Sequence, residues 1–288
     1  MKTLIHSITS AEVMRFIAEP SHALLLEGPV GVGKGSLATY IGASLLGLDE
    51  ERLEGSGYVL RLIPQTSHIP IETIRELQHF LQLKTPGRKA LRRLIIIEQA
   101  DRLTREAQNA FLKILEEPPS DTLILLTSAH TADLLPTIRS RVQRISVKPL
   151  DKATLIKHFE ALGFSEAEIT RASYISEGRV GLMQAILAHE TTHPLALQIE
   201  VAKQLLIEPT FNRLVRVDDL TKQKTSMPEL LQALALVCSA ALRQASEKDD
   251  LKLVKRWHVR LKRLAKAEQN FEHSPNTKLF LTDLLLNL

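Results

Sequence analysis

The sequence predicts an α/β core with a parallel sheet in its first half and an all-α second half. Short apolar runs alternate with helical patterns up to about residue 150, and only helical patterns follow. The apolar runs are continuous rather than alternating, which is typical of strands that helices cover on both faces. A glycine-rich segment follows the first run and precedes a helical pattern, an arrangement typical of phosphate-binding loops.

Five apolar runs are the expected strands of the core. They lie at residues 23–27, 58–63, 94–97, 123–127 and 144–147. Boundary residues mark two of the helices between them. Pro70 opens a helix whose apolar positions form one stripe, and Thr104 is placed to cap another. The second helix is expected to stop before Pro118 and Pro119, because proline cannot continue a helix.

The chain after Pro149 is expected to be helical throughout. Three short helices are expected first, and a boundary follows near residues 191–194. About five further helices are expected beyond that boundary. The short helices lie at 152–162, 166–176 and 182–189, and the longest later ones lie near 227–246 and 251–271. The predicted parts of the chain are therefore residues 1–149, 150–190 and 191–288.

The composition is that of a compact soluble protein from a reducing compartment. The 288 residues are 44% hydrophobic, and the net charge of +4 permits contact with nucleic acid without requiring it. A single cysteine, Cys238, excludes a disulfide framework and a thiolate zinc site. No apolar run approaches the roughly 18 residues that a membrane span needs. We therefore expect a cytoplasmic protein that does not contact membranes.

The glycine-rich segment has the spacing of a nucleotide-binding phosphate loop. In such loops backbone N–H groups surround the phosphates, a lysine meets the terminal phosphates, and the next side chain supplies a hydroxyl to magnesium. The candidate residues are Gly28, Pro29, Val30, Gly31, Val32, Gly33, Lys34, Gly35 and Ser36. Gly35 has no hydroxyl, and Ser36 lies about 100° further around the helix. Magnesium is therefore expected to bind weakly or not at all. Binding of ATP or ADP and a relic loop that only holds the fold both stay open.

The strand at 94–97 ends in Glu98-Gln99, where a hydrolysing enzyme would carry Asp-Glu. Glu98 keeps a carboxylate, one methylene further from the backbone. Gln99 can orient a water molecule but cannot accept its proton. Asp101 follows two residues later and is expected to be a surface or capping acid. The chain is therefore not expected to hydrolyse ATP by itself.

Several segments together resemble bacterial clamp-loader ATPase subunits of the AAA+ family. They lie at residues 28–34, 95–104, 107–119 and 134–141, with a looser match at 274–281. The altered acidic pair resembles the delta-prime branch of this family rather than the hydrolysing gamma/tau branch. The resemblance implies an AAA+ core at 1–149, a helical lid at 150–190 and a helical collar domain for oligomerisation at 191–288.

The resemblance also implies partners and a role in trans. Delta-prime-like subunits join gamma/tau and delta subunits in a hetero-pentamer, and through it act indirectly on a sliding clamp and primer-template DNA during replication. Ser140-Arg141-Val142 lies at the family's Ser-Arg-Cys motif, so Arg141 is the expected arginine finger toward ATP on a neighbouring subunit. Arg139 is expected to be a solvated arginine. We expect Val142, in place of the family's cysteine, to leave the finger usable.

Other positions that the resemblance suggests are weaker. Thr127 and Ser128 lie at the family's first sensor, but hydroxyls at a strand end can equally cap a loop. Gly181 stands where hydrolysing relatives have a second-sensor arginine, and Arg179 substitutes for it only if the register shifts. Many relatives insert a four-cysteine zinc module, but this chain has only the short stretch 48–57 there, so zinc is not expected.

One predicted helix near the end of the chain is strongly basic. Its basic residues are Lys252, Lys255, Arg256, Arg260, Lys262, Arg263 and Lys266. A packed helix with a solvated basic face explains them, and direct contact with DNA is the alternative. Arg88, Lys89, Arg92 and Arg93 are a similar case. The alternatives for the whole chain are a hydrolysing gamma/tau-like subunit, a phosphate-loop kinase for a small substrate, and a scaffold that never binds nucleotide.

Overall fold

The computed structural model describes residues 4–64, 66, 68–83, 90–190, 193–222, 227–271 and 276–288. Contacts divide the chain into two compact units, residues 1–150 and 151–288, and each is described by itself. The basic residues Arg88 and Lys89 and the start of the closing motif, Ser274 and Pro275, lie outside the described residues.

The first unit is built on a parallel sheet of five strands, as the sequence predicts. The strand order across the sheet is β2-β3-β4-β1-β5, and all four pairings are parallel. The strands are β1 (Ala23–Glu27), β2 (Val59–Leu62), β3 (Arg93–Ile97), β4 (Thr122–Ser128) and β5 (Gln143–Ser146). Their bounds differ from the predicted ones by one residue at most. The carboxyl ends of these strands form one edge of the sheet, where ligands of open α/β sheets bind.

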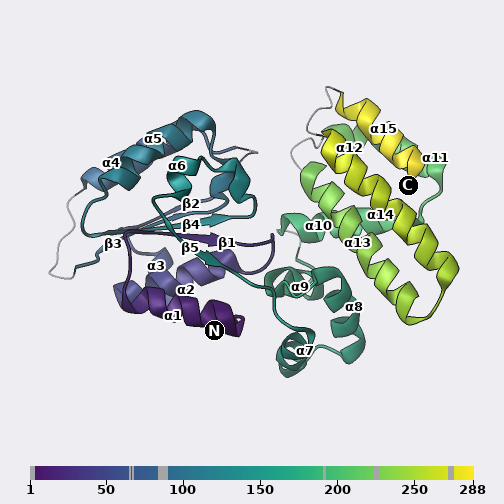
Figure 1. Ribbon diagram of the computed structural model, residues 1–288, viewed down its shortest axis with the longest axis horizontal. Helices are drawn as coiled ribbons and strands as arrows, with labels where there is room; N and C mark the ends of the chain where they lie inside the picture. Colours follow the sequence, from purple (N-terminus) through teal and green to yellow (C-terminus); the bar gives the residue numbers. More distant parts are fainter. Residues whose placement is uncertain are drawn as a thin grey trace. The chain divides into compact units, whose positions relative to one another are not determined.

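Helices cover both faces of this sheet (Figure 1). The helices are α1 (Ser7–Ala18), α2 (Lys34–Leu46), α3 (Glu50–Glu54), α4 (Ile71–Gln82), α5 (Arg105–Glu116) and α6 (Pro136–Arg139), with short turns η1 (Ala100–Arg102) and η2 (Thr131–Asp133). Alternate residues of each strand point to opposite faces. Leu24 and Leu26 accordingly join the core under α1 and α2, while Leu25 joins the core under α4 and α5. The result is a three-layer arrangement with two apolar cores.

The predicted helix boundaries are largely those of the structure. The Thr104 hydroxyl accepts a hydrogen bond from the N–H of Ala107 at 3.2 Å and caps α5, as predicted. The helix after Pro70 begins one residue later, at Ile71, because Pro70 takes the capping position in an extended conformation. Helix α5 ends at Glu116, before the two prolines.

The second unit contains only helices among the residues that the structure describes. They are α7 (Lys152–Ala161), α8 (Glu166–Ser176), α9 (Val180–Leu187), α10 (Pro194–Ile207), α11 (Thr210–Val215), α12 (Val217–Lys222), α13 (Met227–Glu247), α14 (Leu251–Phe271) and α15 (Thr277–Asn287). Six helices follow residue 193 in the described part, against about five expected. The further division of this unit into a lid and a collar remains a prediction.

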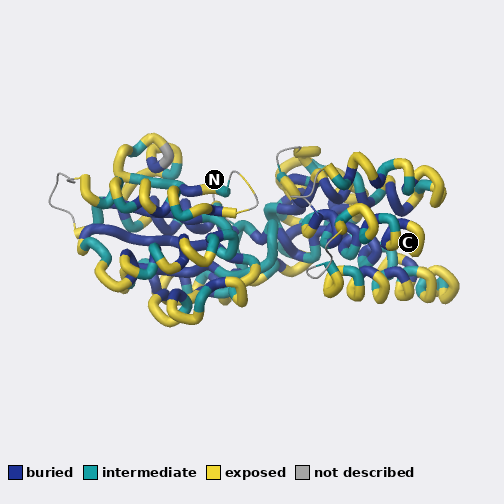
Figure 2. Tube along the Cα trace, turned by 90° about the horizontal axis from the view of Figure 1, so that it is seen from above, coloured by how far each residue is buried: buried dark blue, intermediate teal, exposed yellow. Residues whose placement is uncertain are grey.

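The long helix α13 is the centre of the second unit, since it packs against α8, α10 and α14. Figure 2 shows buried residues on the inner sides of the elements and exposed residues on their outer sides. No helix in the described ranges has the length and apolarity needed to cross a bilayer.

Cys238 lies on α13 and is fully buried. Burial raises the pKa of its thiol to about 11. Because the thiolate is the nucleophile, we expect native Cys238 to react with a disulfide reagent at pH 8 at least about a hundredfold more slowly than the same residue in urea. Thiol release followed by absorbance measures both rates. Equal rates would show that α13 does not bury this residue in solution.

Candidate functional site

The phosphate-loop segment connects β1 to α2 at the carboxyl edge of the sheet. Two of its glycines are required by geometry. Gly28 has φ of +156°, and a Cβ added there would lie 2.7 Å from the carbonyl oxygen of Val147. Gly33 has φ of +97° and precedes the first residue of α2. A side chain at either position would clash or force an unfavourable backbone conformation. The loop therefore takes backbone conformations that only glycine adopts easily at these two positions.

Lys34 is turned back onto its own loop. Its Nζ donates to the carbonyl oxygens of Gly28 at 2.6 Å and Pro29 at 2.9 Å. The residue is buried, with 9% of its surface exposed. A phosphate would have to compete with these carbonyls for the ammonium group.

Gly35 makes room for the carboxylate of Glu98. A Cβ added at position 35 would lie 3.2 Å from Glu98 Oε2, a contact tight enough to require the carboxylate to move. The missing hydroxyl and the position of Glu98 are thus linked. Ser36 is exposed, as expected from its place one residue further around the helix.

An arginine from β2 neutralises this carboxylate. Arg61 Nη1 lies 3.0 Å from Glu98 Oε1, and both side chains are largely buried. The other terminal nitrogen of Arg61 donates to the hydroxyl of Thr39 on α2. Thr39 in turn donates to the carbonyl oxygen of Gly35 at 3.1 Å. The chain thereby closes a network across the site from β2, β3 and α2.

These residues do not fit a magnesium ion. Magnesium prefers oxygen ligands, and here the hydroxyl at position 35 is missing. The carboxylate of Glu98 is already paired with Arg61, whose positive charge would repel a cation at the same place. A role for Arg61 was not predicted from the sequence. Its signal was a charged residue inside an otherwise apolar strand, between Leu60 and Leu62.

The candidate first-sensor residues lie at the end of β4 and are both buried. The hydroxyl of Thr127 accepts a hydrogen bond from the backbone N–H of Gln99 at 3.0 Å. Gln99 itself has φ of +51°, so this bond holds a left-handed turn after β3. The hydroxyl of Ser128 has no hydrogen-bond partner among the described residues. Asp101 accepts the N–H of His130 at 3.2 Å and so links η1 to the residue before η2, while its Oδ1 is buried without a hydrogen-bond partner among the described residues.

Arg141 lies just after α6, and its guanidinium is exposed. Its Nη2 pairs with Glu116 Oε1 at 2.9 Å, and its Nη1 donates to the carbonyl oxygen of Thr137 at 3.1 Å. Glu116 is the last residue of α5 and is itself half exposed. An ion pair this exposed contributes little energy and exchanges readily for another anion. Arg139 is not the solvated arginine that the sequence predicted, because it is only partly exposed and its Nε is buried without a hydrogen-bond partner among the described residues.

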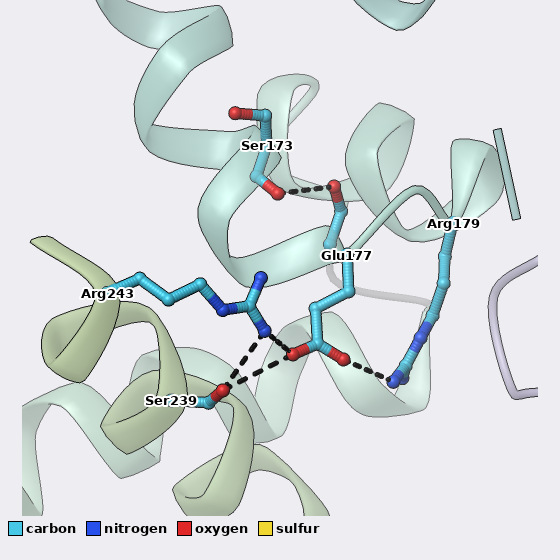
Figure 3. Close-up of polar contacts among 6 residues, drawn as sticks. Ser173, Glu177, Arg179, Ser239 and Arg243 are labelled. Carbon is cyan, nitrogen blue, oxygen red and sulfur yellow. Dashed lines mark hydrogen bonds and ion pairs between the residues drawn. The ribbon is translucent and has the colours of Figure 1, made fainter. Parts of the chain in front are cut away.

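Arg179 has a structural role in the second unit (Figure 3). Its Nη2 lies 3.1 Å from Glu177 Oε2, and burial lowers its pKa although Glu177 opposes this. The other carboxylate oxygen of Glu177 pairs with Arg243 on α13 and accepts from Ser239. Glu177 thus joins the turn between α8 and α9 to α13. One terminal nitrogen of Arg179 is engaged in this cluster, whereas its Nη1 is buried without a hydrogen-bond partner among the described residues.

The known proteins that resemble this chain include DNA polymerase III subunits. Residues 16–151 match the family model described as DNA polymerase III, delta subunit. The chain is 32% identical over 209 residues to DNA polymerase III subunit delta' of Pseudomonas aeruginosa, covering 66% of this chain and 62% of that protein. It is also 32% identical over 163 residues to the subunit of the same name from Bacillus subtilis, covering 52% and 47%. The alignments thus span about half to three fifths of these relatives.

A solved structure has the same fold. It is the DNA polymerase III gamma subunit-related protein from Thermotoga maritima, with a TM-score of 0.57 over 97% of both chains at 20% identity. The predicted resemblance to bacterial clamp-loader subunits is confirmed by the sequence matches, and the AAA+ fold by the structure.

The Arg61–Glu98 pair generates a stability prediction. Because both side chains are mostly buried, we expect Arg61→Leu to destabilise the protein by about 1–3 kcal/mol, since Glu98 is left without its partner. Glu98→Gln in the Arg61→Leu background should recover part of this loss. Urea unfolding of both single variants and the double variant gives a coupling energy, expected at about 1 kcal/mol. Additive effects would show that the two side chains do not interact in solution.

Proposed function

We propose that this chain is a delta-prime-like subunit of a replicative clamp loader, one that hydrolyses no ATP itself and offers Arg141 to ATP on a neighbouring subunit. Its partners would be gamma/tau and delta subunits in a cytoplasmic hetero-pentamer. That assembly would place a sliding clamp on primed DNA. The sequence similarity to delta' subunits supports the class of protein.

The ion pair between Arg61 and Glu98 is the observation that carries the proposal. Hydrolysis of a nucleotide needs a group that positions or activates water and a cation that neutralises the developing charge. Gln99 cannot accept a proton, and Arg61 takes up the carboxylate of Glu98 beside a glycine that supplies no hydroxyl. The loop keeps its backbone course and Lys34. A subunit that keeps the fold and the loop but lacks the groups for hydrolysis is expected to assist hydrolysis on neighbouring subunits.

Arg141 has the properties that a finger in trans needs. Its guanidinium is exposed and points into an ion pair with Glu116 that an incoming phosphate can replace. A planar, permanently charged fork binds phosphate oxygens at two points. In related phosphoryl-transfer systems an arginine finger contributes roughly 10³–10⁵ in rate. Glu116 holds the arginine beside α5 until the neighbour supplies a stronger anion.

A nucleotide at this chain's own loop is a separate matter. The loop amides and Lys34 are the residues that would hold the phosphates of ATP or ADP. Isothermal titration with ATP, with and without magnesium, separates a subunit that retains nucleotide from a scaffold that never binds it. The clamp-loader role proposed above does not require this binding.

The second candidate is a hydrolysing gamma/tau-like subunit, favoured by the intact course of the loop and the presence of Lys34. It predicts turnover by the isolated chain. We expect instead that purified chain and Lys34→Ala release phosphate from ATP equally slowly, at background rates. If the purified chain hydrolyses ATP and Lys34→Ala abolishes this activity, the chain is a hydrolysing subunit and the proposed non-hydrolysing role is wrong.

The finger is tested in the reconstituted assembly. We expect Arg141→Ala to lower the rate of DNA-stimulated ATP hydrolysis by roughly a hundredfold or more at the one site that Arg141 serves. Because the other sites of the complex keep their rates, the total ATPase rate should fall only in part. Arg141→Lys should be impaired too, because a lysine lacks the planar fork. Arg139→Ala is the matched control and should change the rate less than about twofold. An unchanged rate with Arg141→Ala, at full assembly by native mass spectrometry, would rule the finger out.

A further inference from the structure

The positive charge of this protein is concentrated on one helix. The whole chain has 37 Lys and Arg residues against 33 Asp and Glu. Helix α14 alone holds seven of the basic residues and one acidic residue, Glu268. The remainder therefore has 30 basic against 32 acidic residues and is slightly acidic. The basic character comes from α14.

All seven basic residues lie on one side of α14. At about 100° per residue, their positions fall within an arc of roughly 160°. The apolar residues Trp257, Leu261 and Leu264 lie on the opposite side, and Leu264 is buried. The basic face extends from Lys252 to Lys266, a length of about 21 Å at 1.5 Å per residue. Six of its seven basic residues are exposed.

The basic side chains of this face are not ion-paired to carboxylates among the residues that the structure describes. None of its seven basic side chains forms an ion pair there, whereas arginines elsewhere in the same unit are paired, as Arg216 is with Glu208 and Arg243 with Glu177. A solvated face of ordinary composition would intersperse both signs of charge. A single-sign stripe of this length instead creates a strong local potential that attracts polyanions.

The edge of the face contains guanidinium groups held close together. Arg256 and Arg260 lie against the ring of Trp257, at 5.9 and 4.8 Å from its centroid. Arg260 is only 6% exposed, and its Nη1 is buried without a hydrogen-bond partner in the described part of the chain. Burial lowers the pKa of Arg260, and the nearby Arg256 acts in the same direction. Like charges at this density are unfavourable in the absence of an anion.

A shallow pocket lies along the same face. It is lined by Lys255, Arg256, Val259, Arg260, Arg263 and Leu288. Arg263 is fixed there by a hydrogen bond to the carbonyl oxygen of Asn287 at the end of α15. The pocket thus presents three arginines and one lysine, side chains that suit phosphate groups.

We propose that the basic face of α14 binds the sugar–phosphate backbone of a nucleic acid without reading its sequence. A small anion would engage one or two of the seven charges, whereas a backbone follows the whole face. A duplex rises about 3.4 Å per base pair, so the face matches about six base pairs. The inference is independent of Arg141 and of nucleotide binding at the loop.

The test measures binding of the full chain to labelled DNA by fluorescence anisotropy. Two unrelated duplexes and two unrelated single strands are titrated across a range of salt concentrations. The variant is the triple replacement Lys255→Gln, Lys262→Gln and Lys266→Gln, three exposed lysines of the face. The control is Lys113→Gln, Lys148→Gln and Lys157→Gln, which removes the same charge from exposed positions elsewhere. Thermal unfolding checks that both triple variants are folded.

We expect the triple variant of α14 to weaken binding by about tenfold or more on every sequence, and to lower the salt slope by about three. The control should change the affinity less than about twofold. A preference for duplex or single strand identifies which backbone is bound. If the two triple variants weaken DNA binding equally, the net charge of the chain explains the loss and the proposal is overturned. Unlabelled polyglutamate and unlabelled DNA of equal charge are also compared as competitors. If polyglutamate displaces the labelled DNA equally well, the face binds an acidic protein instead and the proposal is overturned.

Discussion

The interaction on which the nucleotide site depends is the ion pair between Arg61 and Glu98. Strands β2 and β3 are parallel neighbours, with Leu62 opposite Ile97, so the last residues of both strands meet at the carboxyl edge of the sheet. There the guanidinium is 3.0 Å from the carboxylate, and Gly35 leaves the space that the carboxylate needs. A positive side chain thus neutralises the carboxylate that follows β3, beside the phosphate-loop segment. The ion pair and the glycine at position 35 are therefore parts of one arrangement.

The guanidinium groups of Arg61 and Arg141 have opposite orientations in the first unit. Arg61 is turned inward, where it neutralises the protein's own carboxylate and fixes α2 to the sheet through Thr39. Arg141 is turned outward, held by an exposed pair with Glu116 and a hydrogen bond to the carbonyl oxygen of Thr137. The first group neutralises a carboxylate within its own unit, and the second is accessible to solvent.

Local patterns were enough to predict the strands, the cap at Thr104 and the position of the phosphate loop. The sequence also identified Gly35 and Gln99 as the altered positions, because the loop and the acidic strand end are continuous segments. It missed Arg61, whose partner lies 37 residues away, since only the order of strands brings the two together. The pair between Glu177 and Arg243 was not predicted either, because 66 residues separate the two and only the packing of helices brings them together. The assignment of Arg179 depended on the register of one turn, which sequence alone does not fix.

The central claim is that Arg61 occupies the electrostatic place of the metal ion. A crystal structure of the chain grown with magnesium and a non-hydrolysable ATP analogue tests it most directly. The account predicts that Arg61 and Glu98 remain about 3 Å apart, with no octahedral ion between Glu98 and position 35, whether or not the analogue is bound. An octahedral magnesium ion coordinated there by Glu98, with Arg61 turned away, would contradict the account.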